Sequence, residues 1–174
     1  YPPGEQPREV EVFVAILGCS LLTYVEAVES QRKEDFITAC ENAFYYYGGV
    51  PRAIVPDNLK SAVTKASRYE ALLNTEFERF GEHYGVTAYP ARARSPKDKA
   101  HVENAVKLTY KDIFTVIEPL HCPDLRSLNV AIRVALEKHN NKNLDRRNYS
   151  RRSYFEDVEQ EALGPLNPIR YQMK

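Results

Sequence analysis

Two apolar runs rich in β-branched residues stand near the start of the chain, separated by a short turn. Val10–Leu17 and Leu21–Val28 are each long enough for one strand, and Gly18-Cys19 between them favours a tight reversal. An apolar hairpin of this kind needs further elements to cover it, because two strands alone cannot bury a core. This feature predicts a layered α/β domain that begins with a hairpin.

Helical periodicity dominates the rest of the sequence. The clearest helix is Lys33–Tyr47, whose apolar residues recur at helical spacing and which ends at Gly48-Gly49. Three further helices are predicted at Asn74–Tyr84, from Pro96 to about Val116, and from Asp124 to about Asn141.

Two short apolar runs lie between these helices. Ala53–Val55 is predicted to be a buried strand that ends at Asp57, and Val86–Tyr89 is predicted to be another strand. The polar segment Leu59–Tyr69 reads as a connection. The predicted order is therefore β-β-α-β-α-β-α-α, a mixed sheet flanked by helices.

Composition narrows the functional classes. Lys plus Arg and Asp plus Glu number 24 each, so the chain has no net charge, and a nucleic-acid binder of this composition must use local basic patches. The three scattered cysteines favour reduced thiols in a cytosolic protein over a disulfide framework or a zinc site. The sequence has no apolar stretch of about 18 residues, so we expect no membrane association.

Two acidic residues are the strongest candidates for chemistry. Asp57 follows a predicted strand, and Glu103 lies about two turns into a helix that Ser95 and Pro96 open. A carboxylate at the carboxyl end of a strand and another on a facing helix could together hold divalent metal. Such an arrangement suits two-metal phosphoryl transfer.

Each acid also has a simpler interpretation. Asp57 could cap the segment that starts at Asn58. Glu103 could form a surface ion pair with Lys99 or Lys107, which lie four residues away along the helix.

Polar and basic residues cluster around the two acids. Their side chains could contact the phosphates of a nucleic acid, although a solvated charged rim would show the same composition. The candidates are Asn58, Lys60, Arg92, Arg94, Lys97, Lys99, Asn104, Lys107 and Lys111.

Several motifs resemble one family in order and spacing. Pro56-Asp57-Asn58 followed by Lys97-Asp98-Lys99-Ala100-His101-Val102-Glu103-Asn104 resembles the retroviral-integrase-like catalytic core of DDE transposases. The resemblance is closer still to IstA-type insertion-sequence transposases. It is carried by Phe13–Ser20, Ala43-Phe44 with Gly48–Arg52, Asp57–Val63 and Ser150–Phe155.

The resemblance implies a ribonuclease H-like fold and a DNA transposase. Asp57 would be the second and Glu103 the third catalytic and metal-binding acid, with two Mg²⁺ ions, or Mn²⁺ in their place. The implied substrates are transposon-end DNA, cleaved at its 3′ end, and target DNA, which receives the 3′-hydroxyl. A helper ATPase, homo-oligomerisation of the full-length protein, and action at the nucleoid in the bacterial cytoplasm are further expectations.

The chain departs from the family at the first acid. The resemblance places that Asp on a first, central strand that should precede the hairpin. Instead Gln6 leads straight into Pro7 and then into the hairpin. We therefore expect that a segment with this strand and its Asp is absent at the Gln6–Pro7 junction. Glu9 and Glu11 are poor substitutes because they lie on the wrong strand.

Other assignments stay open from the residues alone. The same acids would serve a retroelement integrase or a ribonuclease H-like nuclease, and a chain without its first Asp could be a catalytically dead DNA-binding or assembly module. Residues 1–141 are expected to form the catalytic core, with 142–174 as a linker or arm toward a further domain or subunit. Within that arm, Asn143–Arg152 is rich in cations.

Overall fold

The computed structural model describes residues 10–30, 32–55, 67–88 and 96–173. Within the last two ranges, side chains are described for residues 75–87 and 100–173. The chain divides into two compact units. Unit 1 comprises Tyr1–Ser30 with Lys97–Glu161, and unit 2 comprises Gln31–Pro96 with Ala162–Lys174. No helix in the described part of the chain is both long and apolar enough to cross a bilayer.

Unit 1 is built on the predicted hairpin. Strand β1 (Glu11–Ile16) pairs antiparallel with β2 (Thr23–Val28), so that Glu11 lies opposite Val28 and Ile16 opposite Thr23. The turn between them is fixed from a distance by Glu159, whose carboxylate accepts hydrogen bonds from the backbone N–H groups of Cys19 and Ser20, both at 3.1 Å. The hairpin prediction is confirmed.

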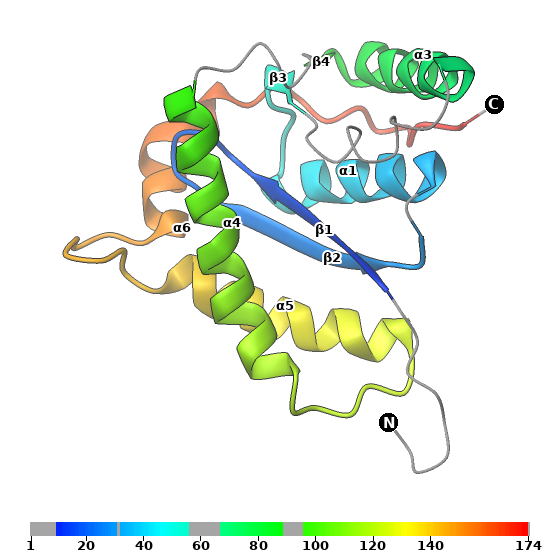
Figure 1. The fold of residues 1–174 in the computed structure, drawn as a ribbon. Coiled ribbons are helices and arrows are strands. Elements are labelled where there is room, and N and C mark those ends of the chain that lie inside the picture. Colours follow the sequence, from blue (N-terminus) through cyan, green and yellow to red (C-terminus); the bar gives the residue numbers. More distant parts are fainter. Residues whose placement is uncertain (1–9, 31, 56–66, 89–95, 174) are drawn as a thin grey trace. The chain divides into compact units, whose positions relative to one another are not determined.

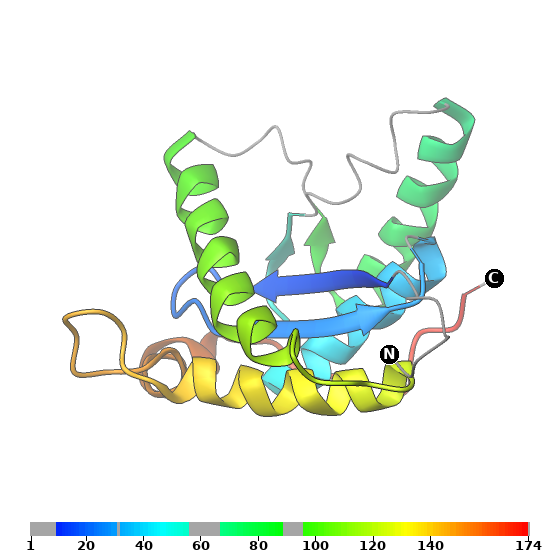
Figure 2. The same cartoon turned by 60° about the horizontal axis from the view of Figure 1, so that its bottom comes forward.

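Three helices accompany the hairpin in unit 1. They are α4 (Pro96–Ile117), α5 (Leu125–Asn141) and the short α6 (Arg151–Tyr154), which continues as a π-helical turn at Phe155–Glu159 and a 3₁₀ turn at Gln160–Ala162. In Figures 1 and 2, α5 runs alongside β2, and α4 stands beside the hairpin where β1 ends. The core of this unit is formed by side chains from all of these elements, among them Phe13, Val25, Ile113, Ile132, Leu136 and Phe155.

Two asparagines on α5 bind the backbone of β2. Asn140 accepts from the Thr23 N–H at 3.1 Å and donates to the Thr23 carbonyl at 2.8 Å. Asn129 makes the equivalent pair with Ala27, at 2.7 and 3.0 Å. Each carboxamide therefore satisfies one N–H and one C=O of the strand, as a neighbouring strand would. This arrangement protects an edge that could otherwise pair with another chain.

Unit 2 contains helices α1 (Lys33–Tyr47) and α3 (Ser67–Tyr84) with the short parallel strands β3 (Ala53–Ile54) and β4 (Thr87–Ala88). Gly48 and Gly85 end the two helices with φ angles of 77° and 71°, a left-handed conformation that glycine adopts without strain. The bounds of α1 agree with the sequence prediction. Helix α3 begins at Ser67, earlier than the predicted Asn74, so part of the predicted connection is helical.

An aromatic cluster forms the core of unit 2. Phe44 of α1 stacks on Phe80 of α3 with ring centroids 5.6 Å apart, and Tyr84 packs edge-on against both. The chain after Leu163 is fastened to the same unit. Gly164 exchanges backbone hydrogen bonds with Val50 at 2.7 and 2.9 Å, and Tyr171 packs against Phe80.

The strand predicted at Ala53–Val55 forms as β3, but its predicted burial is wrong. The run Ala53–Val55 was expected to be a buried strand, but Ala53 is exposed, and Ile54 and Val55 are half-buried. Three apolar residues are too few to distinguish an interior strand from one at a sheet edge.

The described strands form two separate two-stranded sheets, β1 with β2 and β3 with β4. The expectation that a first strand is absent from the sequence at Gln6–Pro7 stays a prediction. The prediction that 142–174 lead toward a further domain or subunit stays a prediction.

Candidate active site on helix α4

Helix α4 presents one long face to solvent. Its buried stripe consists of Ala105, Thr109, Ile113 and Ile117, spaced by four residues. The four candidate site residues with described side chains lie on the opposite face at helical spacing, and all are exposed: Glu103, Asn104, Lys107 and Lys111. The fold therefore brings an acid, an amide and two cations together on one solvent-facing surface.

Glu103 is free of protein partners among the described side chains. The ion pair with Lys107, the simpler interpretation of Glu103, does not form, although the spacing allows it. Lys99, the other possible partner, has a side chain outside the described set. An exposed acid whose oxygens make no contact with the described side chains has the chemistry to bind an external cation.

The remaining candidate residues cannot be placed on this surface. Lys97 and Lys99 belong to the first turn of α4, but their side chains lie outside the described set. The other candidates lie outside the described residues altogether, in the ranges 56–66 and 89–95: Asp57, Asn58, Lys60, Arg92 and Arg94.

A polar cluster holds α4 against α5. Asp112 on α4 accepts a hydrogen bond from His139 Nδ1 at 2.7 Å and pairs with Lys142 at the end of α5. Burial by itself would raise the pKa of Asp112, but the hydrogen bonds from Lys142 and His139 outweigh it and hold that pKa below its usual value. The carboxylate therefore stays charged and fixes the rotation of α4, which keeps the Glu103 face in solvent.

His139 supports this cluster as a neutral ring. Burial lowers its pKa, the nearby charges of Arg151 and Lys142 lower it further, and Asp112 opposes them. With Nδ1 donating to Asp112, Nε2 is an acceptor, and it is buried without a partner among the described residues. His139 is thus a structural residue of the interface between α4 and α5.

The described residues contain no group of three His, Cys, Asp or Glu side chains that could hold a metal ion. Glu103 alone cannot form such a site, but its chemistry fits one. An exposed carboxylate supplies the hard oxygen ligand that Mg²⁺ and Mn²⁺ prefer. Asp57, the second ligand expected from the sequence, would supply the same donor type.

Comparison with known proteins places the chain in a family. The model of the Integrase core domain family matches residues 3–96, which is more than half of the chain. This chain belongs to the integrase core domain family. That assignment makes it a transposase- or integrase-type catalytic core.

Curated relatives extend the similarity to nearly the whole chain. A protein of Sinorhizobium fredii named "Putative transposase y4bL/y4kJ/y4tB" is 41% identical over 93% of this chain and 31% of its own length. One from Burkholderia multivorans, "Putative transposase for insertion sequence IS408", is 36% identical over 95% of this chain and 32% of its own. The chain thus spans about a third of the length of these relatives.

A solved structure supports the fold. The catalytic core domain of BIV integrase superposes with a TM-score of 0.63 over 87% of this chain and 89% of its own, at 14% identity. The integrase core therefore has the expected ribonuclease H-like, mixed α/β fold.

Proposed function

We propose that this integrase core is the catalytic domain of a DNA transposase of the IstA type. The observation that carries the proposal is the exposed face of α4, where Glu103, without a partner among the described side chains, lies beside Asn104, Lys107 and Lys111. Family membership and the transposase names of its relatives support the same conclusion.

The proposed active site uses Asp57 and Glu103 as catalytic metal ligands. Two Mg²⁺ ions, when bound there, would neutralise the charge that develops on the attacking and leaving oxygens of a phosphodiester. The two carboxylates contribute oxygen donors and negative charge that offset the cations. Mn²⁺ prefers the same donors and would substitute.

The proposed reaction has two displacements at phosphorus. In the first, a water oxygen attacks the phosphodiester at the transposon end. The bond from phosphorus to the 3′ oxygen of the end breaks, which leaves a 3′-hydroxyl on the transposon and a 5′-phosphate on the flanking strand. In the second, that 3′ oxygen attacks a phosphodiester of target DNA in line, and the target's own 3′ oxygen leaves. The number of phosphodiester bonds is conserved in the second step.

The polar residues around the acids are proposed to bind DNA. Lys107 and Lys111 lie on the Glu103 face of α4 and would contact backbone phosphates, while Asn104 would position a terminal nucleotide. The remaining members of the set would contact the same substrate: Asn58, Lys60, Arg92, Arg94, Lys97 and Lys99. Phosphate contacts of this kind position DNA without reading its sequence.

Activity requires the first acid of the family. We propose that a segment carrying its strand and Asp is absent at Gln6–Pro7, in line with the separation of the four described strands into two sheets. Because that acid would be the third ligand, the chain as printed should bind DNA but not cut it. A parent sequence that runs through Gln6–Pro7 without an insert would count against this proposal.

The wider assembly is proposed from the family resemblance. Because the chain spans about a third of its relatives' length, further domains would contribute to the full protein. There the core would act as part of a homo-oligomer that holds two transposon ends. It would cooperate with a helper ATPase at target DNA in the bacterial cytoplasm, and residues 142–174 would lead toward a neighbouring domain or subunit.

A strand-transfer assay on the parent protein tests the proposal. With Mg²⁺, the wild type should join a transposon-end duplex to plasmid DNA. Asp57→Ala and Glu103→Ala should each abolish joining and retain DNA binding. Full joining by either variant would end the claim. Binding without joining by the wild-type parent would favour an assembly module in place of an enzyme.

A further inference from the structure

A tight loop projects from unit 1 between α5 and α6. Its base is closed by an antiparallel bridge between Asn143 and Ser150 and by a hydrogen bond of 2.9 Å from the Leu144 N–H to the Tyr149 carbonyl. Inside it, the Arg147 N–H donates to the Leu144 carbonyl, also at 2.9 Å. Both Figure 1 and Figure 2 show this loop standing out from the ends of α5 and α6. We call residues 143–150 the basic loop.

Cations at the base of the basic loop are occupied by internal contacts. Lys142 pairs with Asp112 on α4. Arg151 is 2% exposed and donates to the His139 carbonyl at 3.3 Å, while Arg152 lies 3.9 Å from Glu137. These contacts fasten both ends of the loop to α4 and α5. The rings of Tyr149 and Tyr154, with centroids 5.1 Å apart, pack at the same base.

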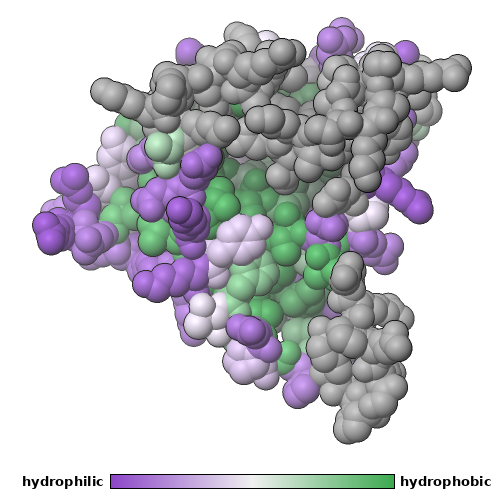
Figure 3. All heavy atoms as spheres, viewed as in Figure 1, coloured by the Kyte–Doolittle hydropathy of each residue, from purple (hydrophilic) through white to green (hydrophobic). Residues whose placement is uncertain are grey.

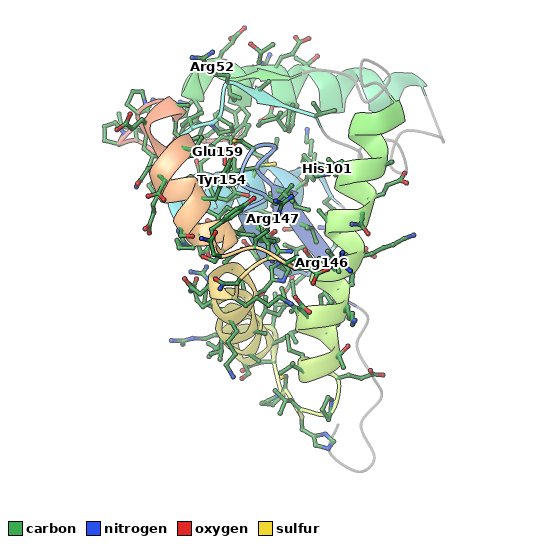
Figure 4. All side chains as sticks on the ribbon, turned by 90° about the vertical axis from the view of Figure 1, so that its left-hand side faces the viewer. Arg52, His101, Arg146, Arg147, Tyr154 and Glu159 are labelled. Carbon is green, nitrogen blue, oxygen red and sulfur yellow. The ribbon has the colours of Figure 1, made fainter. Side chains whose placement is uncertain are left out.

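The two arginines at the tip differ from those at the base. Arg146 and Arg147 are exposed, and neither guanidinium forms an ion pair or a hydrogen bond with another described side chain. Figure 4 shows both projecting from the loop, on the side of unit 1 where Tyr154 and His101 also lie. In Figure 3 the loop forms a hydrophilic rim. The tip carries one acid, Asp145, so its local charge is still positive.

A fastened loop is suited to bind phosphates when it holds two guanidiniums that no described side chain engages. Its backbone is fixed before binding, so binding would cost little conformational entropy. Arginine also matches phosphate geometry better than lysine and is less strongly hydrated. A patch of this kind is what a chain without net charge needs in order to bind a polyanion.

We propose that Arg146 and Arg147 bind backbone phosphates of duplex DNA, as a contact separate from the exposed face of α4. The inference rests on the proposed function, since it assigns a further DNA contact to the same enzyme. Phosphate binding does not read sequence, so the contact would serve a transposon end and unrelated target DNA alike. The binding assay distinguishes these two sources.

The experiment measures DNA affinity of the parent protein against salt concentration. The probes are a duplex from the transposon end and an unrelated duplex of the same length. Neutralising two phosphate contacts should account for about 1.8 units of the slope of log affinity against log salt. Between about 50 and 200 mM salt, the affinity of the wild type should therefore fall roughly 12-fold more than that of Arg146→Ala/Arg147→Ala.

Two control variants separate charge from fold. Arg146→Lys/Arg147→Lys keeps both charges and should retain the wild-type slope. Arg126→Ala/Lys138→Ala removes two exposed cations from α5 and should also leave the slope unchanged. An unchanged melting temperature would show that each variant is folded.

Each outcome has one meaning. Reduced slopes on both duplexes support the contact, and a reduced slope on one duplex assigns it to that DNA. If the wild type binds and joins DNA but the double alanine variant has the wild-type slope, the basic loop is not a DNA contact and the proposed function stands. If the wild type binds neither duplex, both proposals fail.

Discussion

Glu41 and Glu103 both lie on helices, but the first carboxylate is buried and the second is exposed. Glu41 on α1 is 5% exposed and accepts from the Tyr84 hydroxyl at 2.5 Å, from Arg170 Nη1 at 2.9 Å and from the Tyr171 N–H at 2.8 Å. Glu103 on α4 is exposed and accepts nothing from the described side chains. One carboxylate is fully used to join helices α1 and α3 to the end of the chain, and the other is left open.

The contrast shows how a carboxylate's role follows from its donors. A buried acid must find hydrogen-bond donors in the fold, because an unsatisfied charge there is costly. The pKa values of two tyrosine hydroxyls, Tyr84 and Tyr171, reflect their burial and their bonds to acids in this region. Burial and the bond to Glu41 raise the pKa of Tyr84, and burial with a bond to Glu76 raises that of Tyr171 to about 12. An exposed acid without donors among the described side chains adds little to stability, so Glu103 is available for a functional role.

The largest expected effect comes from replacing Glu103, the exposed acid, by glutamine. Glu103→Gln in the parent protein should lower the rate of strand transfer about a thousand-fold, or ~4 kcal/mol in the barrier, because an amide is a poor Mg²⁺ ligand. Its free energy of unfolding should stay within about 0.5 kcal/mol of the wild type. Joining assays and urea unfolding measure the two quantities. Glu118→Gln, at another exposed acid just beyond α4, should change neither.

Glu41→Gln should have the reverse effect: it should lower the free energy of unfolding, the quantity that Glu103→Gln leaves almost unchanged. Whichever way the new carboxamide turns, its NH₂ group faces a donor, either Arg170 or the Tyr171 N–H. We expect a loss of about 3 kcal/mol in the free energy of unfolding, measured with urea. If the variant is as stable as the wild type, Glu41 is not a structural acid and the contrast with Glu103 is wrong.

The asparagines on α5 should show a smaller, graded effect. Asn140 is fully buried, so Asn140→Ala would leave the Thr23 N–H and C=O unpaired and cost about 2 kcal/mol. Asn129 is half-buried, and Asn129→Ala should cost about 1 kcal/mol because water can replace its bonds to Ala27. Urea unfolding of the two variants tests the order, and equal losses would contradict it.

The smallest expected effect is a dependence on pH. The pKa of His139 lies below its ordinary value of 6.5 in the folded protein, chiefly because of burial. The unfolded chain therefore binds a proton that the folded one resists, and stability falls as pH drops below about 6.5. Asp112, whose pKa is lowered from 3.8, adds a further loss at lower pH. In His139→Asn, the decline between about pH 7 and 5 should be shallower; an equally steep decline would exclude His139 as its source.

Sequence patterns were sufficient for the elements with strong local signals. Lys33–Tyr47 was predicted with its observed bounds because its apolar periodicity ends at two glycines. Pro96 and Asp124 likewise marked the starts of α4 and α5. The start of α3 was missed because its first turn, Ser67–Glu70, is polar. Glu70-Ala71-Leu72-Leu73, all good helix formers, were the signal that could have found it.

Long-range partners could not be predicted. Whether an acid is used internally depends on donors far along the chain, such as Arg170 for Glu41 and the Cys19 turn for Glu159. The same holds for the cations of 142–152, a run rich in Lys and Arg whose members the sequence does not distinguish. The fold divides that run into anchored side chains and a pair, Arg146 and Arg147, that has no ion-pair partner among the described residues.

Paramagnetic broadening by Mn²⁺ tests most directly whether Asp57 and Glu103 hold the same metal. In this chain labelled at asparagine, Mn²⁺ should broaden the side-chain amide signals of Asn58 and Asn104 together. Asp57→Ala should then protect Asn104, and Glu103→Gln should protect Asn58. If Asn104 stays broadened in Asp57→Ala, or is never broadened in the wild type, the two acids do not share a metal and the proposed active site is wrong.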